Sequence, residues 1–146
     1  MNSNFKYLCY IYTVKYINIM SNNELLIYLT ENNKVKEIEF FLKNKNVDPS
    51  SYNNFVIKEA SRNGYLKAVE LFLKDSRVDP LVDDNYTIRI ALYNGHLKVV
   101  ELLLKDERVL KKITLQYAKK FNLVEILLRQ LNLKSEVELE NYLKLI

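Results

Sequence analysis

The strongest constraint on the fold is one spacing shared by all the glycines and prolines of the chain. Gly64 and Gly95 are 31 residues apart, and so are Pro49 and Pro80. The sequence contains no other glycine or proline, so every such backbone position follows one period. A fixed period of roughly 20–50 residues is typical of repeat proteins, in which each unit packs mainly against its neighbours.

The period extends to the residues around these positions. Segments 47–77 and 78–108 align without a gap, as VDPSSYNNFVIKEASRNGYLKAVELFLKDSR and VDPLVDDNYTIRIALYNGHLKVVELLLKDER. A first copy covers 16–46, where KEIEFFLKNKN aligns with KAVELFLKDSR. The fourth copy, 109–133, is shortened, because Glu125 follows Glu101 by 24 residues instead of 31. A shortened last unit is expected of a cap, which has a neighbour on one side only.

Each unit is predicted to fold as two antiparallel helices. The segment 97–105 is apolar except for Lys98, Glu101 and Lys105, which helical spacing places on one narrow stripe. A helix this apolar must be packed on several sides, as it would be between neighbouring units. Asn-Gly at 63–64 and 94–95 ends the preceding helices, because glycine adopts a positive φ at little cost. The predicted fold class is therefore all-α.

Both ends of the repeat array carry their own signals. Ser21 and Glu24 form a predicted capping box at the start of the first helix. Counting back by one period places the first copy at 16–46, but residues 1–19 do not resemble the other units, and we interpret them as an N-terminal extension with Met20 as the natural start. Residues 134–146 are predicted to form a capping helix. Its apolar side chains would cover the last unit: Val137, Leu139, Tyr142, Leu143 and Ile146.

The composition is that of a globular protein of the cell interior. Hydrophobic residues make up 49% and charged residues 27%, outside the range of disordered chains. The single cysteine, Cys9, excludes an intramolecular disulfide and fits a reducing compartment. No segment approaches the roughly 18 consecutive apolar residues of a membrane-spanning helix.

The sequence offers no candidate for catalysis. With two glycines in the chain, neither of the usual glycine-rich phosphate-binding loops can be built. His96 is the only histidine and lacks a partner for a zinc site or a nucleophile–base pair. Asp83 and Asp84 are interpreted, with Asn85, as caps of the next helix and not as a metal site. We expect no enzyme activity, no cofactor and no metal.

The second half of each unit resembles the ankyrin repeat. The ankyrin pattern A-A-x-x-G-H-x-x-V-V-x-x-L-L is matched by Ala91, Gly95, His96, Val99, Val100, Leu103 and Leu104. The first half departs from it, since Tyr86-Thr87-Ile88-Arg89 stands where ankyrin repeats carry Thr-Pro-Leu-His. The resemblance covers roughly residues 20–130. Among ankyrin repeats, the chain most resembles the variant found in amoeba-infecting giant DNA viruses and related protist proteins.

The resemblance implies an ankyrin-type solenoid of stacked antiparallel helix pairs with short hairpin-like loops. It also implies binding through the loop tips and the exposed side of the first helices. Carried onto this sequence, the tip positions are Ser51, Tyr52, Asn53, Val82, Asp83 and Asp84, and the helix positions are Arg62 and Tyr93.

We therefore expect a monomeric, non-catalytic protein–protein interaction module with an unidentified protein partner. Two alternatives stay open: a substrate-recruiting adaptor for a host ubiquitin ligase, and a decayed repeat protein without a dedicated partner. Nucleic-acid binding is not expected, because the lysines behind the net charge of +4 are scattered. No membrane association is expected either, and the predicted location is intracellular, in the host cytoplasm if the protein is viral.

Overall fold

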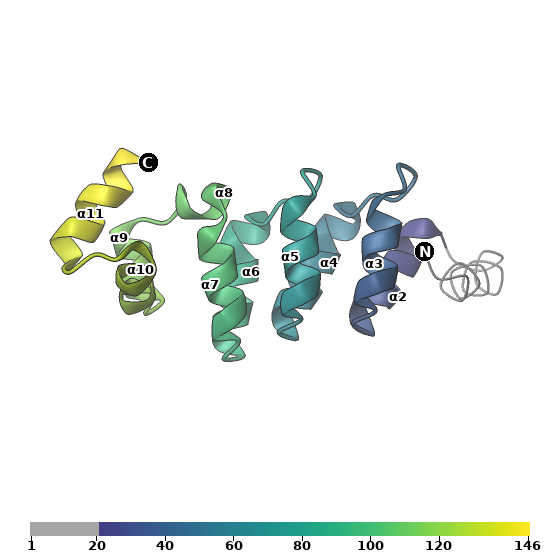
Figure 1. Cartoon of the computed structure of the whole chain (residues 1–146), viewed down its shortest axis with the longest axis horizontal. Coiled ribbons are helices and arrows are strands. Elements are labelled where there is room, and N and C mark those ends of the chain that lie inside the picture. Colours follow the sequence, from purple (N-terminus) through teal and green to yellow (C-terminus); the bar gives the residue numbers. More distant parts are fainter. Residues whose placement is uncertain (1–20) are drawn as a thin grey trace.

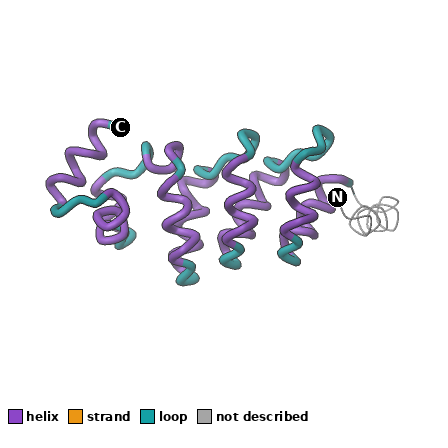
Figure 2. Tube along the Cα trace, in the orientation of Figure 1, coloured by secondary structure: helices purple, strands orange, loops and turns teal. Residues whose placement is uncertain are grey.

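The structure, a computed structural model, describes residues 21–146. The expected extension 1–19, with Cys9 and the proposed start at Met20, lies outside the described residues, as does the beginning of the first unit. Within 21–146 the chain is all-α, and no strand occurs in that range (Figure 2). The loops between units therefore contain no β-hairpin within this part of the chain.

The helices follow one another in pairs, with a short helix between the third and fourth pairs and one helix after the fourth. Their bounds are α2 Asn22–Glu31, α3 Val35–Leu42, α4 Ser51–Arg62, α5 Leu66–Lys74, α6 Val82–Tyr93, α7 Leu97–Lys105, α8 Glu107–Leu110, α9 Leu115–Lys120, α10 Val124–Leu131 and α11 Glu136–Leu145.

The first three pairs are stacked in one row. In Figure 1, α3, α5 and α7 stand side by side, with α2, α4 and α6 behind them. Within these three pairs, each helix contacts its own partner and the equivalent helix of the neighbouring pair. The start of α2 and the C-terminus consequently lie at opposite ends of an elongated molecule (Figure 1).

The core repeats with the sequence. Ile38, Val69 and Val100 occupy one repeat position, and each is buried. Burying a side chain of this size contributes roughly 1.5–3 kcal/mol relative to leaving it exposed. Because equivalent positions are filled in successive pairs, the hydrophobic core runs along the row without a break.

The capping box predicted at the start of the array is confirmed. The Ser21 hydroxyl accepts a hydrogen bond from the Glu24 amide at 3.3 Å, and the Glu24 carboxylate accepts one from the Ser21 amide at 2.6 Å. Two amides that would lack a partner at the first turn of α2 are thereby satisfied.

The caps predicted at residues 83–85 are wrong. Asp83, Asp84 and Asn85 adopt left-handed backbone conformations within α6, with φ of 53°, 56° and 60°. Residues 52–54 of α4 do the same, with φ of 52°, 57° and 53°. Each first helix of these two pairs therefore opens with a left-handed turn, and the side chain of its N-cap residue does not cap the helix.

The last part of the chain departs from the row. In Figure 1, α10 is seen nearly end-on beside the upright α7. The capping helix α11 covers this unit through Leu139, which is fully buried. The prediction that Val137 and Ile146 share this role is wrong, because they are 68% and 40% exposed.

Candidate functional site

An arginine after α5 ties the first two pairs together. The Arg77 guanidinium donates hydrogen bonds to the carbonyl oxygens of Val47 at 2.6 Å and Leu42 at 2.9 Å. The Asp75 carboxylate holds it in place through two further hydrogen bonds, of 2.9 and 2.6 Å. These hydrogen bonds from Arg77 hold the pKa of the Asp75 carboxyl below its ordinary value.

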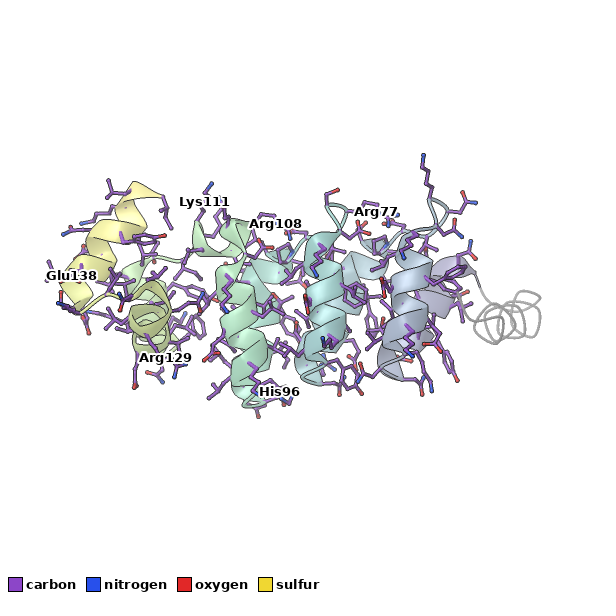
Figure 3. All side chains as sticks on the ribbon, viewed as in Figure 1. Arg77, His96, Arg108, Lys111, Arg129 and Glu138 are labelled. Atoms are coloured by element: carbon purple, nitrogen blue, oxygen red, sulfur yellow. The ribbon has the colours of Figure 1, made fainter. Side chains whose placement is uncertain are left out.

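We call this arrangement, an arginine that donates to two upstream carbonyl oxygens and is held by an aspartate, an arginine clasp. The next unit repeats the clasp one period later. Arg108 donates to the carbonyl oxygens of Val78 and Leu73, both at 2.9 Å, and is held by Asp106. Figure 3 shows Arg77 and Arg108 in corresponding places along one edge of the row. Burial raises the pKa of the Asp106 carboxyl, but the Arg108 guanidinium outweighs it and the net pKa is lowered. Neither clasp was predicted from the sequence. The pattern Asp-x-Arg, which occurs at the same repeat position in two copies, was a signal that could have indicated them.

A second repeated contact runs along the opposite edge. The Tyr65 hydroxyl donates to the Glu31 carbonyl oxygen at 3.3 Å, and His96 Nε2 lies 3.0 Å from the Arg62 carbonyl oxygen. Both acceptors lie 34 residues earlier, near the end of the preceding first helix. The His96 side chain therefore makes a structural contact between two units (Figure 3).

A third repeated contact, from an asparagine side chain to the Asp-Pro turn that follows, is absent at the shortened fourth unit. The side-chain oxygens of Asn23 and Asn54 accept hydrogen bonds from the amides of Asp48 and Asp79, at 2.7 and 2.8 Å. Asn85 is the next equivalent, but the Asp-Pro turn that would follow it is replaced in the shortened unit. Its side-chain oxygen is buried and has no hydrogen-bond partner within the described chain. The boundary between the third and fourth units is therefore incompletely satisfied.

The predicted tip residues have divided roles. Tyr52 is 59% exposed, whereas Asn53 and Asp83 are joined by hydrogen bonds of 2.9 and 3.2 Å. Asp83 also pairs with Lys58 at 3.0 Å. The hydrogen bonds from Asn53 and then Lys58 lower the pKa of the Asp83 carboxyl. Of these residues, Tyr52 has the side chain freest to meet a partner.

Three further tip predictions have different outcomes. Val82 is only 6% exposed, so its assignment to the binding surface is wrong. It is buried because the left-handed turn after it carries residues 83 and 84 outward in its place. Asp84 is exposed, and Ser51 is half-buried.

The two predicted helix positions are equivalent in the repeat but differ in contacts. Arg62 donates to the Tyr86 hydroxyl at 2.8 Å and lies 3.8 Å from Glu59. Tyr93 is 87% exposed, the most exposed large hydrophobic side chain in the described chain. Tyr93 lies at the end of α6 and Tyr52 at the start of α4, so the structure does not bring the two tyrosines together.

Beside Tyr93 lies a groove that the sequence did not predict. It encloses about 670 Å³ between the third pair and the fourth unit, and apolar surface dominates its walls. Its main apolar residues are Ile90 and Tyr93 from α6, Leu97 from α7, Phe121 after α9, and Ile126 from α10. The groove exists because α9 has 6 residues where α6 has 12, so the fourth unit does not cover the face of the third.

Two cations, Arg89 and Lys120, line this groove, and no carboxylate residue does. Within the described chain neither makes an ion pair, and the Arg89 guanidinium has one hydrogen bond, to the Asp83 carbonyl oxygen at 2.7 Å. The Arg89 Nε is buried and has no partner there. Close by, burial raises the pKa of the Tyr117 hydroxyl to about 12, and that hydroxyl also lacks a partner.

Neither a metal-binding cluster nor a membrane-spanning helix occurs in the part of the chain that the structure describes. No cluster of three or more histidine, cysteine, aspartate or glutamate side chains able to hold a metal occurs in residues 21–146. No helix in this range is long and apolar enough to span a membrane.

Searches against protein-family models, curated proteins and solved structures found no significant match to this chain.

Proposed function

We propose that this chain is a non-catalytic protein-binding module of the ankyrin-repeat type. The 31-residue period supports the repeat class, together with contacts that recur at the same separation in successive units. These contacts fix the row of helix pairs and occupy the side chains that make them. A scaffold of this kind presents its remaining exposed side chains in fixed positions, which reduces the entropy lost on binding.

The exposure of Tyr93 and Tyr52 carries the proposal of binding. They are 87% and 59% exposed on the first helices of consecutive pairs, and neither takes part in the repeated contacts between units. Aromatic side chains are enriched among the residues that dominate protein interfaces. An apolar groove beside Tyr93 adds concave surface to this face.

Affinity capture with two matched double variants tests the proposal. The chain is used as bait in cell extract, and captured proteins are quantified for wild type and for Tyr52→Ala/Tyr93→Ala. We expect specific partners to fall by about tenfold or more with the double variant, since interface anchors contribute 2 kcal/mol or more. The melting temperature should change little, because both tyrosines are exposed.

The control variant is Val137→Ala/Leu145→Ala, which removes exposed apolar surface on α11, away from the proposed face. It should capture the same proteins as wild type. Equal capture by all three chains, or loss with the α11 variant alone, would contradict the proposed surface. Arg62 is left out of the test because its hydrogen bond to Tyr86 is also structural.

A further inference from the structure

We infer that the groove between the third and fourth units binds an acidic peptide segment of a partner protein, in which a large apolar side chain is flanked by carboxylates. The inference rests on the proposed function and names the chemistry of the partner. It is carried by two features of the groove: its apolar walls and its unpaired cations.

The apolar walls select a large hydrophobic side chain. Leu97 is 54% exposed beside Tyr93, so α6 and α7 both leave apolar surface in water at this junction. Phe121 and Ile126 form the opposite wall. Covering such surface with a leucine or phenylalanine side chain contributes roughly 25 cal/mol per Å² of apolar area removed from water.

The charges select carboxylates next to that side chain. Arg89 is the only one of the chain's five arginines without a carboxylate within ion-pair distance in the described residues. Lys120 lies 5.3 Å from the centre of the Phe121 ring, on the opposite wall. A carboxylate on the peptide could accept from the guanidinium of Arg89, and the flat, forked geometry of that group favours this pairing.

The place of the unpaired charge distinguishes this groove from a merely basic surface. The other cations near this face are already neutralised, since Lys58 pairs with Asp83 and Arg62 with Glu59. Unsatisfied positive charge on this face is therefore concentrated where the apolar walls are.

A protein segment fits these features better than a nucleic acid does. Nucleic-acid binding surfaces track a phosphate backbone with many cations in a row. Here two unpaired cations lie beside a groove of about 670 Å³, which has room for a side chain. One or two carboxylates beside an apolar anchor match this arrangement.

The experiment is selection of a displayed random-peptide library on the immobilised full chain. Peptides retained by wild type are counter-selected on Tyr93→Ala/Lys120→Glu and then sequenced. We expect the peptides lost on the variant to share an aromatic or large aliphatic residue with aspartate or glutamate on either side. The most enriched peptide is then synthesised, and its affinity measured by fluorescence polarisation.

Lys120→Glu should weaken that peptide by about tenfold or more, equivalent to 1.4 kcal/mol. Lys105→Glu is the matched control, because it makes the same change in net charge at an exposed, unpaired lysine at the far end of α7, and it should leave the affinity within about twofold. Arg89→Gln, which keeps a hydrogen-bond donor but removes the charge, should weaken acidic peptides and spare a peptide whose carboxylates are replaced by amides.

Several results would overturn the inference. They are the absence of any enriched peptide, enriched peptides without net negative charge, and equal loss with Lys120→Glu and Lys105→Glu. Competition by an oligothymidine strand stronger than by the peptide would assign the groove to nucleic acid. Concentration-dependent dimerisation lost in Tyr93→Ala would assign it to a second copy. Peptides whose binding is lost on substitution of Tyr52 but not of Lys120 would support the proposed function and would show that the groove is not the binding site.

Discussion

Gly64 and Gly95 have the same conformation but different surroundings. Both have positive φ, of 71° and 74°, in the turn between the two helices of a pair. A Cβ on Gly64 would lie 2.6 Å from Nδ1 of the His96 ring, whereas a Cβ on Gly95 would meet no atom within 4 Å. The difference arises because the third unit packs a histidine over Gly64, and the shortened fourth unit packs nothing over Gly95.

Alanine substitutions at the two glycines should therefore have unequal effects. Gly95→Ala should lower the free energy of unfolding by about 1 kcal/mol, the cost of a side chain at positive φ. Gly64→Ala should cost about 1 kcal/mol more, because it displaces His96 and breaks its hydrogen bond to Arg62. Urea denaturation of the purified variants measures both values.

His96→Ala provides the control for this pair. Combined with Gly64→Ala it should remove the extra cost, because the added Cβ then no longer meets the imidazole ring. Equal costs for the two glycine variants would show that the ring is not packed over Gly64.

The carboxylates of the arginine clasps should make stability depend on pH. The pKa values of Asp75 and Asp106 are lowered in the folded chain from 3.8. A carboxyl whose folded pKa is lowered stabilises the protein above its unfolded pKa, and this contribution is lost as pH falls through the folded value. We expect Asp75→Asn to cost about 1–2 kcal/mol at neutral pH and progressively less below pH 3.8.

Urea midpoints measured from neutral pH down to about pH 3 give this comparison. Asp84→Asn is the reference, since Asp84 is exposed and has no ion pair in the described chain. Parallel pH curves for wild type and Asp75→Asn would contradict the role assigned to the clasp.

At the scale of elements, the first helices of the second and third pairs begin in an unusual way. Three consecutive residues in each, none of them glycine, adopt the left-handed conformation. Asparagine and aspartate tolerate this conformation better than other residues with a Cβ, and they fill five of the six positions. The turn exposes Tyr52 and buries Val82, so it also decides which side chains a partner can reach.

Substitutions at Asp84 should reveal the strain of this turn. The residue has φ 56° and ψ 59°, and its side chain is exposed. Asp84→Gly should be more stable than Asp84→Ala by about 1 kcal/mol, because only glycine enters this region without a steric cost. Thermal denaturation of the two variants compares them directly. An alanine variant as stable as the glycine variant would show that residue 84 is not left-handed in solution.

The helices were the predictable elements, and the contacts between them were not. Apolar runs and Asn-Gly turns indicated the paired helices, and the Ser21 capping box was read correctly. The contacts of Arg77 were not predictable from its local sequence, because its acceptors lie 30 and 35 residues earlier. Val82 looked like an exposed tip, since the Asp83-Asp84-Asn85 run after it suits a helix cap as well as a left-handed turn.

The candidate site was predictable only in part for the same reason. Tyr52 and Tyr93 are exposed as expected, and their helical positions follow from the period. The groove depends on what a shortened unit leaves uncovered, which involves α6, α7 and α10 together. Its cations, Arg89 and Lys120, are 31 residues apart in sequence and become one feature only in the folded chain.

At the scale of the whole molecule, hydrogen bonds between units are most complete in the middle of the row. The second pair has neighbours on both sides and shares clasps with each, whereas the fourth unit lacks the clasp and leaves Asn85 unsatisfied. Beyond apolar contacts, Arg129 on α10 reaches the third pair through an exposed ion pair with Glu101. Pairs of this kind contribute at most about 1 kcal/mol.

Protection against hydrogen exchange should follow this gradient. Amides of α4 to α7 should be the best protected, and those of α9 to α11 should exchange faster by about tenfold or more, equivalent to 1.4 kcal/mol of local stability. Mass spectrometry of peptides from a timed exchange provides the measurement. Uniform protection from α2 to α11 would show that the fourth unit is as firmly docked as the others.

The repeated clasp also has a genetic consequence. Each arginine meets acceptors at fixed distances upstream, so a crossover that adds or removes one whole 31-residue block leaves every donor with an acceptor. A gene for such a chain can change length by unequal recombination without a new interface having to evolve. A block of another length would leave donors without their acceptors. The 24-residue step into the last unit illustrates this, because the repeated contacts end there and the Asn85 side-chain oxygen has no partner in the described chain.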